Sequence, residues 1–275
     1  SLIAATITDI KRNEVPNWLS FSLIAVAFAI RAICSVMTSQ LYYILYALIA
    51  LILFYLLSNI LYYIKFFGGG DAKLLLALAV VFATTPSFIL YQQPLFFEEP
   101  FLLSFLINIF IIGSVYSWIF ITFFAIKNHA TFAVEFKKIH RKAKTMRICL
   151  LILALALLIA SFFIAVFIPL FIMVLIFPYL YIIAKATENT SMIKLVSPRY
   201  LTEGDWLVEK VKVKNKMIGP SIHGLNAKDI AILRKSNKKV LIRYGIPFVP
   251  VFLISLVITF LFGDLIILIL KALFF

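Results

Sequence analysis

The sequence has little charge and almost no cysteine, and each shortage excludes a class of protein. Charged residues make up 14% of the 275 residues, against about 25% in a typical soluble domain. Cys34 and Cys149 are the only cysteines, too few for a disulfide scaffold or a cysteine-based zinc module. The three histidines lack metalloprotease spacing, and no serine-hydrolase motif occurs. We therefore expect neither a metal nor another cofactor.

What the sequence has in abundance is apolar side chains, which make up 64% of its residues. Disorder is excluded, because disordered chains have low hydrophobicity. A soluble domain cannot bury this much apolar surface, so the natural solvent is a bilayer. The composition predicts an all-α polytopic membrane protein of about 6–8 transmembrane helices with a small cytoplasmic α+β insert.

Hydrophobic runs of spanning length set the expected helices. The candidate spans are 17–37, 41–64, 71–90, 101–126 and 246–270, together with the charge-free stretch 148–184. That last stretch is too long for one pass. It suits two passes broken near Pro169, or one pass plus a re-entrant piece. The first ten residues form half a span and the chain begins without Met, so we expect part of the first helix to precede residue 1. Arg31, inside the second span, is expected to snorkel to the membrane interface.

The positive charge is strongly clustered. Of the 26 Lys and Arg residues, seven lie in 127–147 and thirteen in 185–243. In a soluble protein a net charge of +14 would suggest nucleic-acid binding. Here the clusters fall between hydrophobic runs, which is the positive-inside pattern of a multi-pass plasma-membrane protein. We expect both clusters to be cytoplasmic and to contact lipids with anionic headgroups, and we expect no nucleic-acid partner.

These patterns predict three parts of the chain: a transmembrane domain over 1–184 with a basic cytoplasmic loop at 127–147, a small cytoplasmic α+β cap over 185–245, and a C-terminal transmembrane helix over 246–275. Within the cap, period-two alternation predicts a strand over 208–214. The remaining elements expected there are a helix over 227–234, with Asn226 as its N-cap, and a strand over 239–244.

Two of the twelve acids lie at cytoplasmic ends of expected spans, Asp9 and Asp71. Ionisable groups in such positions are candidates for function. Asp71 follows Gly68, Gly69 and Gly70, which permit close backbone approach or a positive φ. The alternatives are structural: Asp71 could favour a helix start, and Asp9 could pair with a nearby Lys or Arg.

The other acids are weaker candidates. Glu14, in the loop after Asp9, could meet a basic peptide or be a solvated loop charge. Asp264 is expected near the opposite leaflet and is therefore not a catalytic candidate. Glu203 and Asp205 flank Gly204 and indicate a turn.

The sequence around the two aspartates resembles a known family. Asp9 is followed by Lys11, Arg12, Asn13, Glu14, Val15, Pro16 and Asn17, and Gly68-Gly69-Gly70-Asp71 is followed by Ala72-Lys73. These are similar to the Asp-x6-Pro-[Asp/Asn] segment and the GxGD signature of type IV prepilin peptidases. Two weaker pieces, residues 201–205 and 245–250, resemble the archaeal branch, which includes preflagellin (prearchaellin) peptidases.

The resemblance implies a membrane aspartyl endopeptidase that uses Asp9 and Asp71. It implies a prepilin or prearchaellin substrate, whose short basic leader is cut at the cytoplasmic membrane face. Two adjacent carboxylates share a proton, so that one activates water while the other polarises the scissile carbonyl. The paired CxxC motifs associated with N-methylation are absent, so we expect no methyltransferase activity. The alternatives are a presenilin-like GxGD protease and a non-enzymatic transporter or scaffold with a basic lipid-binding cap.

Overall fold

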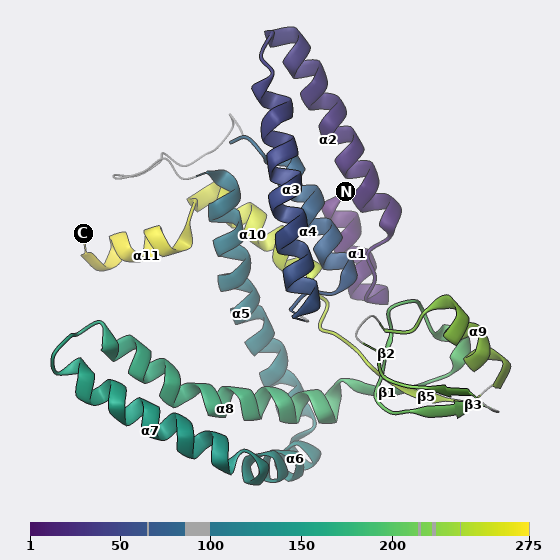
Figure 1. Ribbon diagram of the computed structural model, residues 1–275, viewed down its shortest axis with the longest axis vertical. Coiled ribbons are helices and arrows are strands. Elements are labelled where there is room, and N and C mark those ends of the chain that lie inside the picture. Colours follow the sequence, from purple (N-terminus) through teal and green to yellow (C-terminus); the bar gives the residue numbers. More distant parts are fainter. Residues whose placement is uncertain (65, 86–99, 214–215, 222–223, 237, 275) are drawn as a thin grey trace. The chain divides into compact units, whose positions relative to one another are not determined.

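The computed structural model describes residues 1–64, 66–85, 100–213, 216–221, 224–236 and 238–274 (Figure 1). Its helices are α1 (Leu2–Arg12), α2 (Asn17–Thr38), α3 (Tyr42–Tyr63), α4 (Gly69–Val81), α5 (Phe101–Lys127), α6 (His129–Lys142), α7 (Lys144–Ser161), α8 (Phe167–Ser191), the short η1 (Pro198–Tyr200), α9 (Ala227–Ser236), α10 (Val249–Phe262) and α11 (Leu265–Phe274). Its strands are β1 (Ile193–Val196), β2 (Trp206–Leu207), β3 (Val211–Val213), β4 (Lys216–Ile218) and β5 (Val240–Arg243).

Five helices, α2, α3, α5, α7 and α8, are long and apolar enough to cross a membrane, and the bent pair α10–α11 makes a possible sixth span within the described residues. Their large apolar side chains are mostly exposed, as expected of surfaces that face lipid rather than water. The predicted polytopic helical membrane fold is confirmed. The chain divides into two compact units, residues 1–117 with 245–275, and residues 118–244.

In the first unit, α4 is the central helix. It packs against both α2 and α3, and Figure 1 shows these three helices side by side. Seven of its thirteen residues are buried, so α4 contacts protein around most of its circumference. The expected span at 71–90 is seen as this shorter helix, and residues 86–90 of it lie outside the described part of the chain.

Arg31 was expected to snorkel to the membrane interface, and this prediction is wrong. Its side chain instead binds the C-terminal end of α4. The side chain is only 7% exposed. Its Nε donates to the Val80 carbonyl at 3.0 Å, and its Nη2 to the Val81 carbonyl at 2.9 Å. The last carbonyls of a helix have no intrahelical donor, and a cation there also complements the helix dipole. The guanidinium is therefore buried in the protein, because it donates hydrogen bonds to the last carbonyl groups of α4.

The C-terminal hydrophobic run, expected to form one helix, is bent by 50° between α10 and α11. Gly263 takes a positive φ of 74° at the break. Asn108 of α5, fully buried, donates to the Thr259 hydroxyl at 2.9 Å and to the Gly263 carbonyl at 2.8 Å. It also accepts from the Leu265 amide at 3.1 Å. One amide side chain therefore satisfies two backbone groups exposed by the break, the Gly263 carbonyl and the Leu265 amide.

The second unit contains a helical hairpin and the cap. The stretch 148–184 forms α7 and α8, which pack against each other, so the two-helix alternative is the observed one. The turn falls at residues 162–166, and Pro169 lies inside the first turn of α8. That position suits proline, because the first amides of a helix have no intrahelical acceptor. The amphipathic α6 also packs on α8, through Ile139 and Ile182.

The cap is an α+β unit with two small antiparallel sheets, ordered β1-β5-β2 and β3-β4. Helix α9 begins after Asn226, whose Oδ1 accepts from the Asp229 amide at 2.8 Å, so the predicted N-cap is confirmed. The predicted strand at 239–244 appears as β5. Of the predicted strand at 208–214, residues 211–213 form β3, and residue 214 lies outside the described part of the chain. A bend at residues 208–209 separates β3 from β2.

Because Arg31 satisfies the end of α4, its loss should destabilise the first unit. We expect Arg31→Met to lower the free energy of unfolding by about 2–3 kcal/mol, since buried carbonyls lose charged donors. Thermal unfolding in detergent measures this, with Arg12→Met, at an exposed arginine, as the matched control. Equal melting temperatures for the two variants would contradict the capping role.

Candidate active site

Asp9 lies in the last turn of α1, a poor place for a negative charge. The helix ends at Asn13, which adopts the left-handed conformation with φ 52°, a conformation that Asn tolerates better than most residues. The Asn13 amide donates to the Asp9 carbonyl at 2.7 Å. The helix dipole disfavours an anion at this end, and the Asp9 side chain is only 5% exposed. Such a carboxylate needs donors from elsewhere in the chain.

Those donors come from the start of α10. The Val249 amide donates to Asp9 Oδ2 at 2.9 Å, in a buried hydrogen bond between residues 240 positions apart. The Phe248 amide also faces this carboxylate. The N-terminal end of a helix favours anions, so α10 compensates for the unfavourable position of Asp9 at the end of α1.

Asp71 lies in the first turn of α4, where a carboxylate is favoured. Its Oδ2 accepts from the Gly68 amide at 3.0 Å. A Cβ on Gly68 would come within 3.1 Å of that same oxygen, and a Cβ on Gly70 within 3.1 Å of Val15 Cβ. The glycines therefore allow close approach, the first of the two uses expected of them. None of the three has a positive φ.

Two contacts connect the segment after Asp9 with the start of α4. The Val15 side chain lies over Gly70, where a Cβ would have little room. Lys73 Nζ donates to Asn17 Oδ1 at 2.7 Å, so the polar residue after Pro16 binds the lysine that follows Asp71. The sequence placed both residues in recognisable motifs but gave no signal that they bind each other.

The two carboxylates interact electrostatically. Burial, and secondarily the charge of Asp9, raise the pKa of Asp71 to about 7, against the opposing effect of the Gly68 hydrogen bond. Burial also raises the pKa of Asp9, while the Val249 and Phe248 amides act in the opposite direction. Both residues lie outside the candidate membrane spans. Near neutral pH the pair can therefore hold one proton, with Asp71 as its carrier.

Two other polar side chains belong to this region. The Tyr116 hydroxyl, on α5, is within electrostatic range of Asp9, and its ring packs against the same core as α1 and α4. The sequence analysis did not single it out, because one tyrosine among twelve carries no signal. Glu14 is exposed in the loop after α1, and no ion pair involves it among the described residues.

The weaker acidic candidates have structural roles. Asp264 Oδ1 accepts from the Ile266 amide at 2.7 Å and caps α11. Asp205 Oδ2 accepts from the Thr202 amide at 2.9 Å and closes a turn. Gly204 in this turn has a φ of 97°, and a Cβ on Gly224 would overlap its backbone. Within the described part of the chain, no three His, Cys, Asp or Glu side chains cluster as a metal site.

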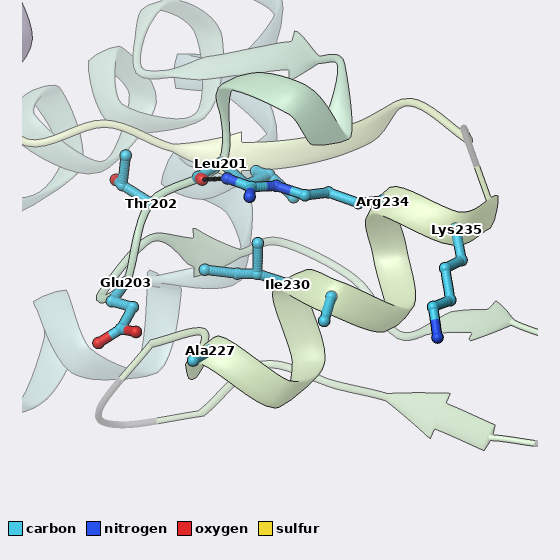
Figure 2. A pocket seen from close by; sticks show the side chains of 8 residues that line it. Leu201, Thr202, Glu203, Ala227, Ile230, Arg234 and Lys235 are labelled. Atoms are coloured by element: carbon cyan, nitrogen blue, oxygen red, sulfur yellow. Dashed lines mark hydrogen bonds between the residues drawn. The ribbon is translucent and has the colours of Figure 1, made fainter.

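A cavity of about 660 Å³ lies in the cap, between α9 and the turn at residues 201–203 (Figure 2). Arg234, on one wall, donates to the Pro198 carbonyl at 3.3 Å and to the Leu201 carbonyl at 3.1 Å, so its guanidinium holds the turn in place. Neither Asp9 nor Asp71 lines the cavity. This cavity is therefore separate from the candidate site formed by the two aspartates.

Comparison with known proteins gives one match. Residues 1–126 match the model of the type IV leader peptidase family. The matched region contains both aspartates, their flanking motifs and almost all of α5. It confirms the resemblance found in the sequence and indicates a peptidase. No curated protein and no solved structure matches the chain.

The raised pKa of Asp71 can be tested without any substrate. We expect infrared spectra to show a protonated carboxyl that titrates near pH 7 and is missing in Asp71→Asn. In Asp9→Asn this titration should move to lower pH, because the neighbouring negative charge is gone. An Asp71 carboxyl already ionised at pH 5, in a folded protein, would contradict the description of the pair.

Proposed function

We propose, because residues 1–126 match the model of the type IV leader peptidase family, that this multi-pass membrane protein is an aspartyl endopeptidase. It removes the short basic leader of type IV pilin-like or archaellin precursors at the cytoplasmic membrane face, without methylating the product. The observation that supports this proposal is the electrostatic interaction between Asp9 and Asp71, which lie in separate motifs.

The environments of the two carboxylates suggest their roles. Asp9 receives amide donors at the start of α10, which favour its ionised form, so it is the base that deprotonates water. Asp71, with a pKa of about 7, holds the proton and donates a hydrogen bond to the scissile carbonyl. Cleavage should therefore weaken above neutral pH as Asp71 ionises, and at low pH as Asp9 becomes protonated.

The substrate-binding assignments rest on what surrounds the pair. Gly68, Gly69 and Gly70 leave backbone accessible beside Asp71, and an extended peptide can pair with such backbone. We assign Glu14, which is exposed on the loop that follows Asp9, to binding the positive charge of the leader. Its carboxylate has no cation partner among the described residues, so it remains available to the substrate.

Lipid contacts are proposed for the basic stretches. A groove of about 280 Å³ between α7 and α8 is lined by Lys144 and Arg147, at the basic start of α7, and by apolar residues that include Ile148, Leu151 and Pro178. Cations beside an apolar groove match the headgroup and acyl chain of an anionic phospholipid. This basic end then marks the cytoplasmic leaflet.

The dyad is tested by two isosteric substitutions. In vesicles supplied with prepilin and prearchaellin precursors, Asp9→Asn and Asp71→Asn should each reduce leader cleavage by at least about 10²-fold, because each role in acid–base catalysis is lost. The wild-type enzyme should keep its activity in EDTA.

Asp264→Asn is the matched control, since Asn caps a helix about as well as Asp. It should cleave normally. Wild-type rates in either dyad variant, or EDTA inhibition that zinc reverses, would overturn the assignment.

The proposed orientation makes a separate prediction about sidedness. In a background of Cys34→Ser and Cys149→Ser, cysteines introduced by Lys137→Cys and Lys194→Cys should react with an impermeant maleimide from the same side of sealed vesicles. Gln40→Cys, in the loop before α3, should react from the other side. Labelling of positions 137 and 194 from opposite sides would exclude the two-pass orientation of α7 and α8.

A further inference from the structure

The segment Phe248–Val249 lies outside the region that matches the family, yet it contacts both catalytic motifs. In the first turn of α10, Pro250 has no N–H, and the Val251 amide donates to the Phe248 carbonyl at 2.9 Å. The Val249 amide is thus the first-turn donor directed outward from α10, and Asp9 accepts from it. Pro247 and Pro250, on either side, restrict the backbone dihedrals.

The Phe248 side chain makes the second connection. Its ring centroid lies 5.3 Å from that of Phe67, which is buried immediately before Gly68. It also lies 5.9 Å from the ring of Phe252, edge to face. Opposite the ring is Gly113 of α5, where a Cβ would stand only 2.6 Å from Phe248 Cζ. The ring therefore fills a space that exists because residue 113 has no side chain.

We propose that Phe248 and Val249 are positioning residues of the active site, which fix the Asp9 carboxylate through the backbone and set it in register with the Gly68–Asp71 motif through the Phe248 ring. Gly113 permits this position of the Phe248 ring because it has no side chain. The inference rests on the proposed peptidase function and adds a third segment to its two motifs.

The physical consequence is a preorganised base. A carboxylate hydrogen-bonded to an amide at a helix N-terminus is held in one orientation and favoured as an anion. The titratable groups that face Asp9 are Asp71 from α4 and Tyr116 from α5. When Asp71 is ionised, its negative charge favours the neutral form of Asp9. The amides at the start of α10 act in the opposite direction and favour the Asp9 anion.

The test begins with Gly113→Ala, which adds only the Cβ that collides with the ring. Displacing Phe248 should move the Val249 amide away from Asp9. We expect kcat for precursor cleavage to fall at least about 10-fold, the effect of losing a hydrogen bond to a charged group, with KM changed much less. The acid limb of the pH–rate profile should move to higher pH, because Asp9 loses donors that favour its anion.

A second variant and a control separate positioning from general damage. Gly113→Ala combined with Phe248→Leu should recover part of kcat, because the smaller side chain relieves the collision. Phe105→Leu, at a fully buried position of the same core, should lower the melting temperature and leave the pH profile unchanged.

The outcomes for this proposal and for the peptidase assignment are distinguishable. If the wild-type protein cleaves precursors while Gly113→Ala keeps its kcat and pH profile, the positioning role is overturned and the assignment survives. If Gly113→Ala shows only a lower melting temperature with the same profile as Phe105→Leu, the segment is merely structural. Absence of cleavage by the wild-type protein would overturn the peptidase assignment itself.

Discussion

A carboxylate that is removed from water must find hydrogen-bond donors, and Asp9 has few nearby. It lies at the end of a short helix whose dipole disfavours a negative charge there. That helix packs against an apolar core. The bond from the Val249 amide meets this requirement and fixes where α10 begins relative to α1. α10 also packs against α1, and its residues Val251 and Phe252 are buried in the same core. Both observations agree with the position of α10 that this hydrogen bond requires.

The position of the second aspartate, Asp71, depends on the packing of its own helix, α4. Asp71 belongs to α4, which packs against α2 and α3, and Arg31 closes the far end of that helix. Its own end is open, because three glycines leave room for Val15 and for the chain that follows Asp9. The pair thus combines one aspartate on a helix whose far end is held by Arg31 with one whose carboxylate accepts a hydrogen bond from a remote backbone amide.

The sequence was informative where physical chemistry leaves a local signature. Hydrophobic length predicted the long helices, charge clusters predicted two basic regions, and the residues around Asp9 and Asp71 marked these two aspartates as candidates. It could not reveal Val249 as a partner of Asp9, since a backbone amide has no side-chain signature and lies 240 residues away. The break at Gly263 was hidden because the sequence stays apolar across it, and its compensation comes from Asn108 on another helix. Arg31 was misread because its acceptors are main-chain carbonyls.

The distance in sequence between Asp9 and Val249 also has a consequence for biosynthesis. A chain made from its N-terminus produces both aspartates early, but the amide that orients the first of them is made only near the end of translation. Nascent and prematurely terminated chains therefore contain both acids without the Val249 amide that donates to Asp9 in the complete fold. In the proposed peptidase, such a dependence would keep a growing chain from cutting the other polypeptides being inserted beside it.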